Sequence, residues 1–328
     1  MLAYITRRLL LALVTMVAIS AISFVIILLP PGDYITFYVA QQLAEGTTIT
    51  SQEAEALRAR YGLNQPVAVQ YLKWMNAVVR GDFGMSLSWQ RDVAGLIWER
   101  LLLTVVLSLA AVLFTWALAL PIGIYSAVRQ YSVGDYLFTF ISFIGLAVPN
   151  FLLALALMYL GFAFFDANIG GLFSPEYLNA PWSMARVWDL LKHVPLPATI
   201  LALGGTAQVV RVMRANLLDE LRKPYVTTAR AKGLSERHVI LVHPVRVALN
   251  PFVSTIGYLF PYIVSGSVIV SLVLGLPTVG PLLLSALLAQ DMFLAGAIVL
   301  MLGAMTVIGT LISDLLLMWI DPRVRSEG

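Results

Sequence analysis

A polar, basic stretch in the second half of the chain contains the residues best suited to contact a protein partner. Residues 225–237 read Tyr-Val-Thr-Thr-Ala-Arg-Ala-Lys-Gly-Leu-Ser-Glu-Arg. Apolar side chains recur between the basic ones, and Val239 follows shortly after. Polar side chains of this kind cannot lie in hydrocarbon, so the pattern predicts a short helix outside a membrane that docks on a partner. A solvated loop is the alternative.

Residues for covalent, nucleotide or metal chemistry are absent from the sequence. There is no Gly-x-x-x-x-Gly-Lys-Ser/Thr phosphate loop, so the chain is not expected to bind ATP itself. The three histidines, His193, His238 and His243, have no metal-ligand spacing, and there are no cysteines. We therefore expect no catalytic residue, no metal site and no cofactor on this chain.

Small and hydroxyl side chains follow helical spacing in three apolar segments. The members are Thr104, Ser108, Ala111 and Thr115, then Ser142, Gly145, Pro149 and Asn150, and finally Ser254, Tyr258, Pro261, Tyr262 and Ser265. Spacings of three and four place each set on one face of a helix. In lipid such faces pack on neighbouring helices or line a water-filled path. We favour packing for the first set, and we predict a translocation path at Asn150, Ser254, Tyr258, Tyr262 and Ser265. Pro149 and Pro261 are expected to kink their helices.

The composition requires a membrane around these segments. Of the 328 residues 59% are hydrophobic and only 12% are charged, whereas soluble domains are about a quarter charged. The mean hydropathy is +0.85. The basic residues flank apolar segments and form no soluble basic face, which argues against nucleic-acid binding.

Apolar runs predict six crossings, at about residues 9–29, 102–125, 136–165, 197–216, 251–274 and 292–320. Gly204 and Gly205 weaken the fourth, for which a re-entrant segment is the alternative. An even number of crossings places both termini on one side, and most of the 21 Lys and Arg residues lie on that side, which predicts that both termini are cytoplasmic. No ionisable residue lies deep in these runs, and Asp314 comes nearest. A transporter coupled to an ion gradient usually has such residues.

A mixed-charge segment, residues 31–98, separates the first two crossings and is expected outside the membrane as a small external domain. It contains a predicted short helix from Glu53 to Arg60 and a turn-rich loop from Gly81 to Ser86. The predicted organisation is therefore 1–30 for the N-terminus and first span, 31–98 for the external domain, and 99–325 for the membrane core. The core includes the loop 217–249 that contains the basic stretch.

The stretch 225–237 resembles the cytoplasmic loop signature of permeases of dipeptide/oligopeptide-type ABC importers. Aligned on Gly233, the wider importer pattern Glu-Ala-Ala, three residues, Gly falls on Thr227, Thr228 and Ala229, so two positions depart from it. Further similar segments occur in the family's order along nearly the whole chain. They are Tyr4–Ile5, Arg7–Arg8, Pro31–Asp33, Tyr61–Pro66, Gln70–Tyr71, Gly81–Ser86, Gly275–Pro281, Ala289–Asp291, Asp314 and Asp321–Arg325. Thr278 departs from the family's Pro-Gly-x-Gly.

The resemblance implies an all-α polytopic permease of the type I ABC-importer fold in a bacterial inner membrane. It implies a second, similar permease, two ATP-binding subunits that hold ATP and Mg²⁺, and a solute-binding protein outside. The loop would carry the coupling helix, for which we predict contacts by Tyr225, Ala229, Arg230, Ala231, Lys232, Gly233, Leu234 and Arg237. The family transports peptides, with oligosaccharides, opines or nickel as alternatives. A secondary transporter or channel that works alone is the alternative function, and a membrane-anchored assembly or signalling protein is a third.

Overall fold

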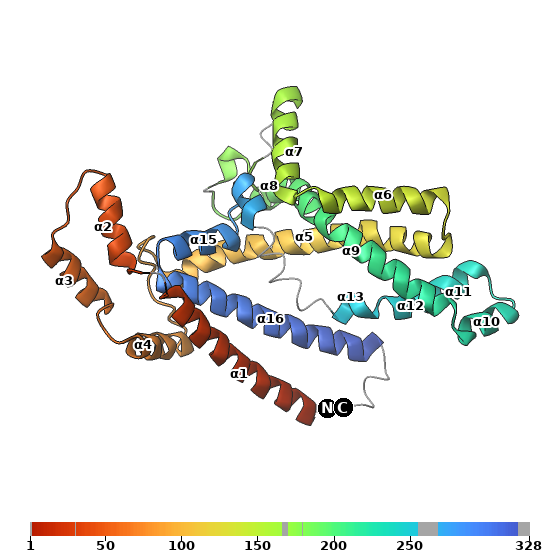
Figure 1. The fold of residues 1–328 in the computed structure, drawn as a ribbon, viewed down its shortest axis with the longest axis horizontal. Coiled ribbons are helices and arrows are strands. Elements are labelled where there is room, and N and C mark those ends of the chain that lie inside the picture. The colour runs from red at the N-terminus through yellow and green to blue at the C-terminus, as the bar shows by residue number, and fades with distance from the viewer. Residues whose placement is uncertain (1, 30, 166–169, 179, 255–267, 321–328) are drawn as a thin grey trace. The chain divides into compact units, whose positions relative to one another are not determined.

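The computed structural model of the chain is helical (Figure 1). It describes residues 2–29, 31–165, 170–178, 180–254 and 268–320. Among these residues the only β pairing is an isolated antiparallel bridge between Met85 and Asp92. The all-α prediction is therefore confirmed for the described part of the chain.

The chain forms two compact units, and each is described by itself. Unit 1 comprises residues 1–104 and 277–308, and unit 2 comprises residues 105–276 and 309–328. The helices that begin in unit 1 are α1 (Leu2–Ile27), α2 (Tyr34–Ala44), α3 (Ser51–Tyr61), α4 (Val67–Val79), α5 (Val93–Val128), α15 (Val279–Leu288) and α16 (Met292–Ile320). Those of unit 2 are α6 (Val133–Ala147), α7 (Asn150–Phe165), the 3-10 turn η1 (Pro175–Tyr177), α8 (Met184–His193), α9 (Pro195–Leu221), α10 (Pro224–Ala231), α11 (Glu236–Val242), α12 (Pro244–Ala248) and α13 (Asn250–Ser254). Helices α5 and α16 continue from unit 1 into unit 2.

Among the described residues, four helical segments are long and apolar enough to cross a bilayer: Leu10–Ile27, Val93–Val128, Met184–Leu221 and Met292–Ser313. A fifth span results if α6 and α7 are counted together. The fourth predicted span is continuous, because α9 passes through Gly204 and Gly205 without a break. The predicted span 251–274 lies largely outside the described residues, so a count of six stays a prediction.

The third predicted span is sharply bent rather than straight. Helices α6 and α7 meet at 94°, with the break at Val148 and Pro149. Proline has no N–H to continue the helical ladder and disfavours a helical conformation at the residue before it, and Val148 is extended. The expected kink at Pro149 is confirmed.

Within unit 1, the segment between the first two spans folds into three short helices, of which only α3 was predicted. Asp33 caps α2 and Thr50 caps α3, each in a reciprocal capping box. Gly62 ends α3 at a φ of 71°, a left-handed conformation that glycine adopts without a side-chain clash. Apolar side chains of α2, α3 and the loop before α5 form a small core of Tyr34, Ile35, Ala54 and Leu87.

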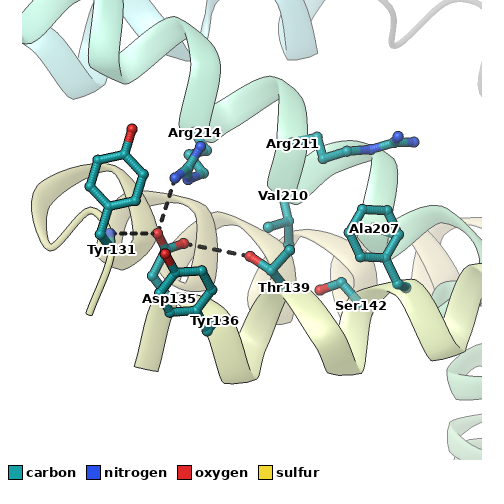
Figure 2. A pocket seen from close by; sticks show the side chains of 10 residues that line it. Tyr131, Asp135, Tyr136, Thr139, Ser142, Ala207, Val210, Arg211 and Arg214 are labelled. Atoms are coloured by element: carbon teal, nitrogen blue, oxygen red, sulfur yellow. Dashed lines mark hydrogen bonds and ion pairs between the residues drawn. The ribbon is translucent and has the colours of Figure 1, made fainter. Parts of the chain in front are cut away.

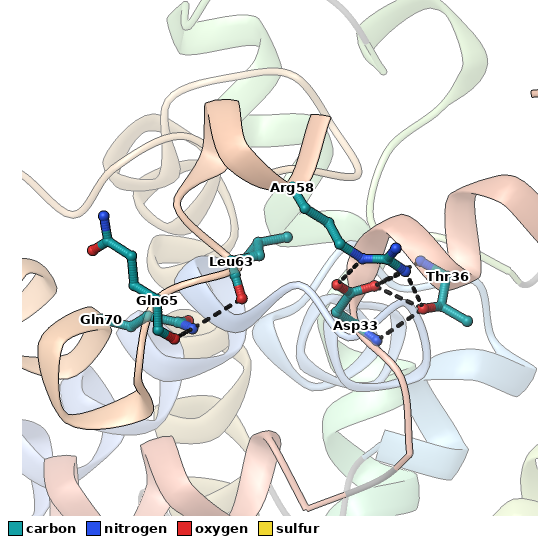
Figure 3. A network of polar contacts seen from close by, with 6 residues as sticks. All are labelled: Asp33, Thr36, Arg58, Leu63, Gln65 and Gln70. Carbon is teal, nitrogen blue, oxygen red and sulfur yellow. Dashed lines mark hydrogen bonds and ion pairs between the residues drawn. The ribbon is translucent and has the colours of Figure 1, made fainter. Parts of the chain in front are cut away.

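Polar contacts fix the ends of these short helices (Figure 3). Arg58 of α3 donates two hydrogen bonds to the Asp33 carboxylate, from Nε to Oδ2 at 2.7 Å and from Nη2 to Oδ1 at 3.2 Å, and a third to Thr36. Gln70 of α4 donates its amide to the carbonyls of Leu63 and Gln65, across the turn that joins α3 to α4.

Unit 2 is built around α9, which contacts α6, α7, α8 and α12. Its core holds Ala127 of α5, Met213 and Leu217 of α9, and apolar residues of α11 to α13: Ile240, Val245, Ala248 and Phe252. Ser108 and Ala111 are buried in α5, and in unit 1 Thr104 is buried and accepts the N–H of Val279 at 2.9 Å. These burials agree with the packing interpretation of this helix face.

Candidate coupling segment and transport path

The basic stretch forms two short helices joined by a glycine turn. Helix α9 ends at Leu221, and Pro224 begins α10 at a position where the missing N–H costs no hydrogen bond. Gly233 has a φ of +77° and its N–H bonds the Arg230 carbonyl at 2.9 Å. Helix α11 then starts at Glu236. The predicted short helix is present as α10.

The side of this segment that faces inward is apolar. Val226, Ala229 and Val239 pack together and are buried. This cluster holds α10 against α11, so the two helices form one body. Ala229, which we predicted as a docking contact, therefore lies in the interior of the segment.

The remaining predicted docking residues are exposed. They are Tyr225, Arg230, Ala231, Lys232, Gly233, Leu234 and Arg237. Tyr225 and Leu234 leave 39% and 41% of their surface open. The structure thus brings seven of the eight predicted residues to the surface of one small body.

An ion pair spans the turn between the two helices. Arg230 donates from Nη2 to Oε1 of Glu236 at 2.6 Å and from Nε to Oε2 at 3.1 Å. The hydrogen bonds from Arg230 lower the pKa of the Glu236 carboxyl below its ordinary value. Arg230, one of the basic residues predicted to contact the ATP-binding subunit, therefore already has an acidic partner within the chain.

Tyr225 ties the start of α10 to the end of α9. Its hydroxyl donates to Oε2 of Glu220 at 2.6 Å. Burial raises the pKa of the Tyr225 hydroxyl, and the hydrogen bond to the Glu220 carboxylate raises it further, so the tyrosine stays protonated and remains a donor. The sequence search did not single out Glu220.

Of the five predicted path residues, the structure places one side chain. Asn150 begins α7, directly after the bend, and its amide lies against the backbone of α9 at Gly204. A Cβ at Gly204 would lie 2.5 Å from the Asn150 amide nitrogen, so a larger residue there would require the Asn150 side chain to move. Ser254 is the last residue of α13, while Tyr258, Tyr262 and Ser265 lie outside the described residues.

A polar contact that sequence reasoning missed joins α6 to α9 (Figure 2). Asp135 is buried in the first turn of α6 and accepts a hydrogen bond from Arg214 Nη2 at 3.0 Å and from the Tyr131 N–H at 2.9 Å. Sequence reasoning had counted Arg214 only as a basic residue near a span end. Charged residues 79 positions apart give no pairing signal in a single sequence.

Beside this pair lies a cavity of about 270 Å³ between α6 and α9. Its lining residues are Tyr131, Asp135, Tyr136, Thr139, Ser142, Phe143, Ala207, Val210, Arg211 and Arg214. Among the described residues there is no group of three or more His, Cys, Asp or Glu side chains that could hold a metal ion.

Comparison with known proteins identifies the chain over its whole length. Residues 119–326 match the family model of the binding-protein-dependent transport system inner membrane component, and residues 1–110 match that of the N-terminal part of such membrane components. An oligopeptide transport system permease protein of Bacillus subtilis is 36% identical over 99% of this chain and all of its own length. A putative peptide permease protein of Brucella ovis is 35% identical over 99% of each chain. A dipeptide transport system permease protein of Alkalihalophilus pseudofirmus is 29% identical over 99% of this chain.

These matches bear out the resemblance noted in the sequence and decide against a transporter that works alone. The long apolar helices agree with a multi-pass protein of the membrane. The chain belongs to the family of inner-membrane components of binding-protein-dependent transport systems, the permeases of ABC importers.

Proposed function

We propose that this permease forms, with a second similar permease, the path by which peptides enter the cell, driven by ATP hydrolysis on two separate subunits. Three relatives of nearly the same length are named for peptide, oligopeptide or dipeptide transport, which supports peptides over sugars, opines or nickel. A solute-binding protein delivers the peptide from outside. Six spans and cytoplasmic termini are part of this proposal.

The observation that carries the proposal is the body formed by α10 and α11. It presents exposed Tyr225 and Leu234 beside basic side chains, and it is joined firmly to a long apolar helix. Exposed aromatic and aliphatic side chains among charges are typical of protein-docking surfaces. We assign this surface to the ATP-binding subunit.

A chain of contacts within unit 2 would pass a push on α10 into the membrane. Tyr225 links α10 to α9 at Glu220, and Ile240 and Val245 pack α11 and α12 on the α9 core. Helix α9 in turn contacts α6 through Arg214 and Asp135, and α7 through Gly204 and Asn150. A displacement of α10 therefore moves α9 together with the bent span, a two-state element that nucleotide would bias.

The test is Gly233→Arg in the assembled transporter, reconstituted in vesicles with its binding protein. We expect the variant to reach the membrane and to lose peptide uptake while ATP hydrolysis continues, because the new side chain projects from the docking surface. Gly233→Asn distinguishes the effect of a large side chain on the docking surface from the effect of strain in the backbone. Asparagine tolerates a left-handed conformation better than most residues do.

The matched control is Gly46→Arg, in the external segment. Gly46 also has a positive φ, +84°, and open space around it. Normal coupled uptake in Gly233→Arg would overturn the docking assignment. Loss of uptake in Gly46→Arg to the same extent would show that the defect is a general one.

A further inference from the structure

We propose that the cavity between α6 and α9 binds the phosphate of an anionic phospholipid, with Arg211 as the residue that recognises its charge. The relevant leaflet is the one on the side of the membrane where α10 lies. This site is separate from the coupling segment and from the predicted path residues.

The charges at the cavity are unbalanced. It is lined by two arginines and one aspartate, which leaves a net charge of +1. Arg214 is committed to Asp135, at 3.0 Å. Arg211 has no carboxylate within ion-pair distance among the described residues, and its hydrogen-bond acceptor is the neutral Gln208, at 2.9 Å. Figure 2 shows the Arg211 side chain directed away from Asp135. An anion at this place would therefore meet an unneutralised guanidinium.

The remaining lining suits an amphiphile rather than a free anion. Most of the cavity surface is apolar, and Phe143 lies beneath the Arg211 guanidinium, 5.9 Å from ring centre to Cζ. Phe140 and Tyr136 precede Phe143 by about one and two helical turns, and each leaves 63% of its surface exposed. An acyl chain along this face of α6 would cover these rings while its phosphate reaches Arg211. A free phosphate would leave them uncovered.

The depth of the site also fits a lipid headgroup. Arg211 and Arg214 lie about three and two turns before α9 ends, and α10 follows outside the apolar span. Tyr131, in the turn before α6, lies at the end of the cavity where Arg214 meets Asp135. Tyrosine and arginine side chains are typical of the boundary between hydrocarbon and headgroups, and basic pockets between spans are known to bind lipid headgroups.

The test uses the full chain purified from membranes and transferred to nanodiscs that contain equal parts of phosphatidylglycerol and phosphatidylethanolamine. Native mass spectrometry counts the lipids of each kind that stay bound. We expect a preference for phosphatidylglycerol that falls about fivefold in Arg211→Gln, the factor for one basic residue near an anionic surface. Arg222→Gln, an exposed arginine at the end of α9, is the matched control and should keep the preference.

A second measurement identifies what covers the cavity. Since the chain has no cysteine, a bimane label at Ser142→Cys reports on this cavity alone. Brominated phosphatidylglycerol should quench the label more strongly than brominated phosphatidylethanolamine does, and inorganic phosphate should not relieve the quenching.

Four results would overturn the proposal. An unchanged lipid preference in Arg211→Gln would show that Arg211 does not recognise the lipid. An equal loss of preference in Arg222→Gln would show that basic residues attract anionic lipids in general, without a defined site. Relief by inorganic phosphate would indicate a free-anion site. A label that neither lipid quenches would mean that a protein partner, such as the second permease, covers this face.

Discussion

Ser86 donates its hydroxyl to the buried carboxylate of Asp291 at 2.6 Å, and this bond joins the loop before α5 to the start of α16. The same oxygen, Oδ2, accepts the N–H and the hydroxyl of Ser88 at 3.0 and 2.9 Å. The other oxygen accepts the Leu294 N–H at 3.2 Å, in the first turn of α16. Asp291 is fully buried. Its charge is thus held by four donors and by the positive end of a helix.

We predict that Asp291→Asn destabilises the protein by about 1–3 kcal/mol, the cost of leaving a buried polar group unsatisfied. Donors face both oxygens of the carboxylate, so the amide N–H₂ of asparagine meets a donor in either orientation. The measurement is the thermal unfolding midpoint of the purified chain in detergent, which should fall.

Glu99→Gln is the control, because it removes a carboxylate of the same unit from an exposed ion pair with Arg91 at 2.8 Å. Exposed pairs contribute little to stability, so its midpoint should stay close to that of the unsubstituted chain. Equal midpoints for both variants would contradict a structural role for the Asp291 charge.

The Asp33–Arg58 pair should make the external segment sensitive to acid. Burial opposes ionisation of Asp33, but hydrogen bonds from Arg58 and Thr36 outweigh it and hold the pKa of the carboxyl below its ordinary 3.8. A depressed folded-state pKa gives stability that is present above the ordinary value and lost as the pH falls through the folded value. We expect Asp33→Asn to cost about 1 kcal/mol at pH 7, and this difference should shrink below about pH 4.

Thermal unfolding of Asp33→Asn and of the unsubstituted chain, compared from pH 7 down to pH 3, checks this prediction. Glu55→Gln, on the exposed side of α3, is the control and should show no such trend. If the difference for Asp33→Asn grew as the pH fell, the assigned direction of the pKa shift would be wrong.

Local patterns in the sequence predicted several elements correctly. Helix α3 follows from its charged, helix-forming residues and from Gly62 as a stop signal, and the bend before α7 follows from Pro149. The turn at Gly81 to Ser86 is present, with positive φ at Gly81 and Gly84. Each of these features depends on residues close together in the chain.

Contacts between distant residues could not be predicted in this way. Ser86 and Asp291 each lie in a segment that resembled the permease family, yet nothing in either segment indicates that they meet. Asp135 and Arg214 pair across 79 positions, and no local pattern in the sequence indicates this. The burial of Ala229 depends on Val239, which reaches it only because Gly233 reverses the chain. In the external segment, α2 and α4 were not predicted, although the helical period of α4 is present in the sequence.

The close approach of α5 to α9 should make Gly123 intolerant of a larger residue. A Cβ there would lie 2.7 Å from Cβ of Met213 and 3.1 Å from the Val210 carbonyl oxygen. Neither atom is the free end of a flexible side chain, so the helices must separate. We expect Gly123→Ala to cost about 1–3 kcal/mol, as overpacking does in other cores, and to lower the thermal midpoint.

Gly205→Ala provides the comparison for this substitution. Its Cβ would meet Thr115 Cγ2 at an ordinary 3.7 Å, and alanine favours a helix over glycine by up to about 1 kcal/mol. The midpoint of this variant should be unchanged or raised. If Gly205→Ala proved the more damaging of the two, the packing of α9 described above would be incorrect.

The hydrogen bond from Tyr225 to Glu220 should matter more for coupling than for stability. Tyr225→Phe keeps the exposed ring and removes only the donor that links α10 to α9. If α10 moves α9, the loss of this link lets α10 slip during each ATP cycle. We expect the ratio of ATP hydrolysed to peptide imported, measured in vesicles, to rise about two- to tenfold, the range for one net hydrogen bond.

Thr228→Val is the control for this substitution, since the Thr228 hydroxyl donates to the Pro224 carbonyl within α10, at 3.0 Å. An unchanged ratio in Tyr225→Phe would mean that the packing of α11 and α12 on α9 transmits the motion without this bond.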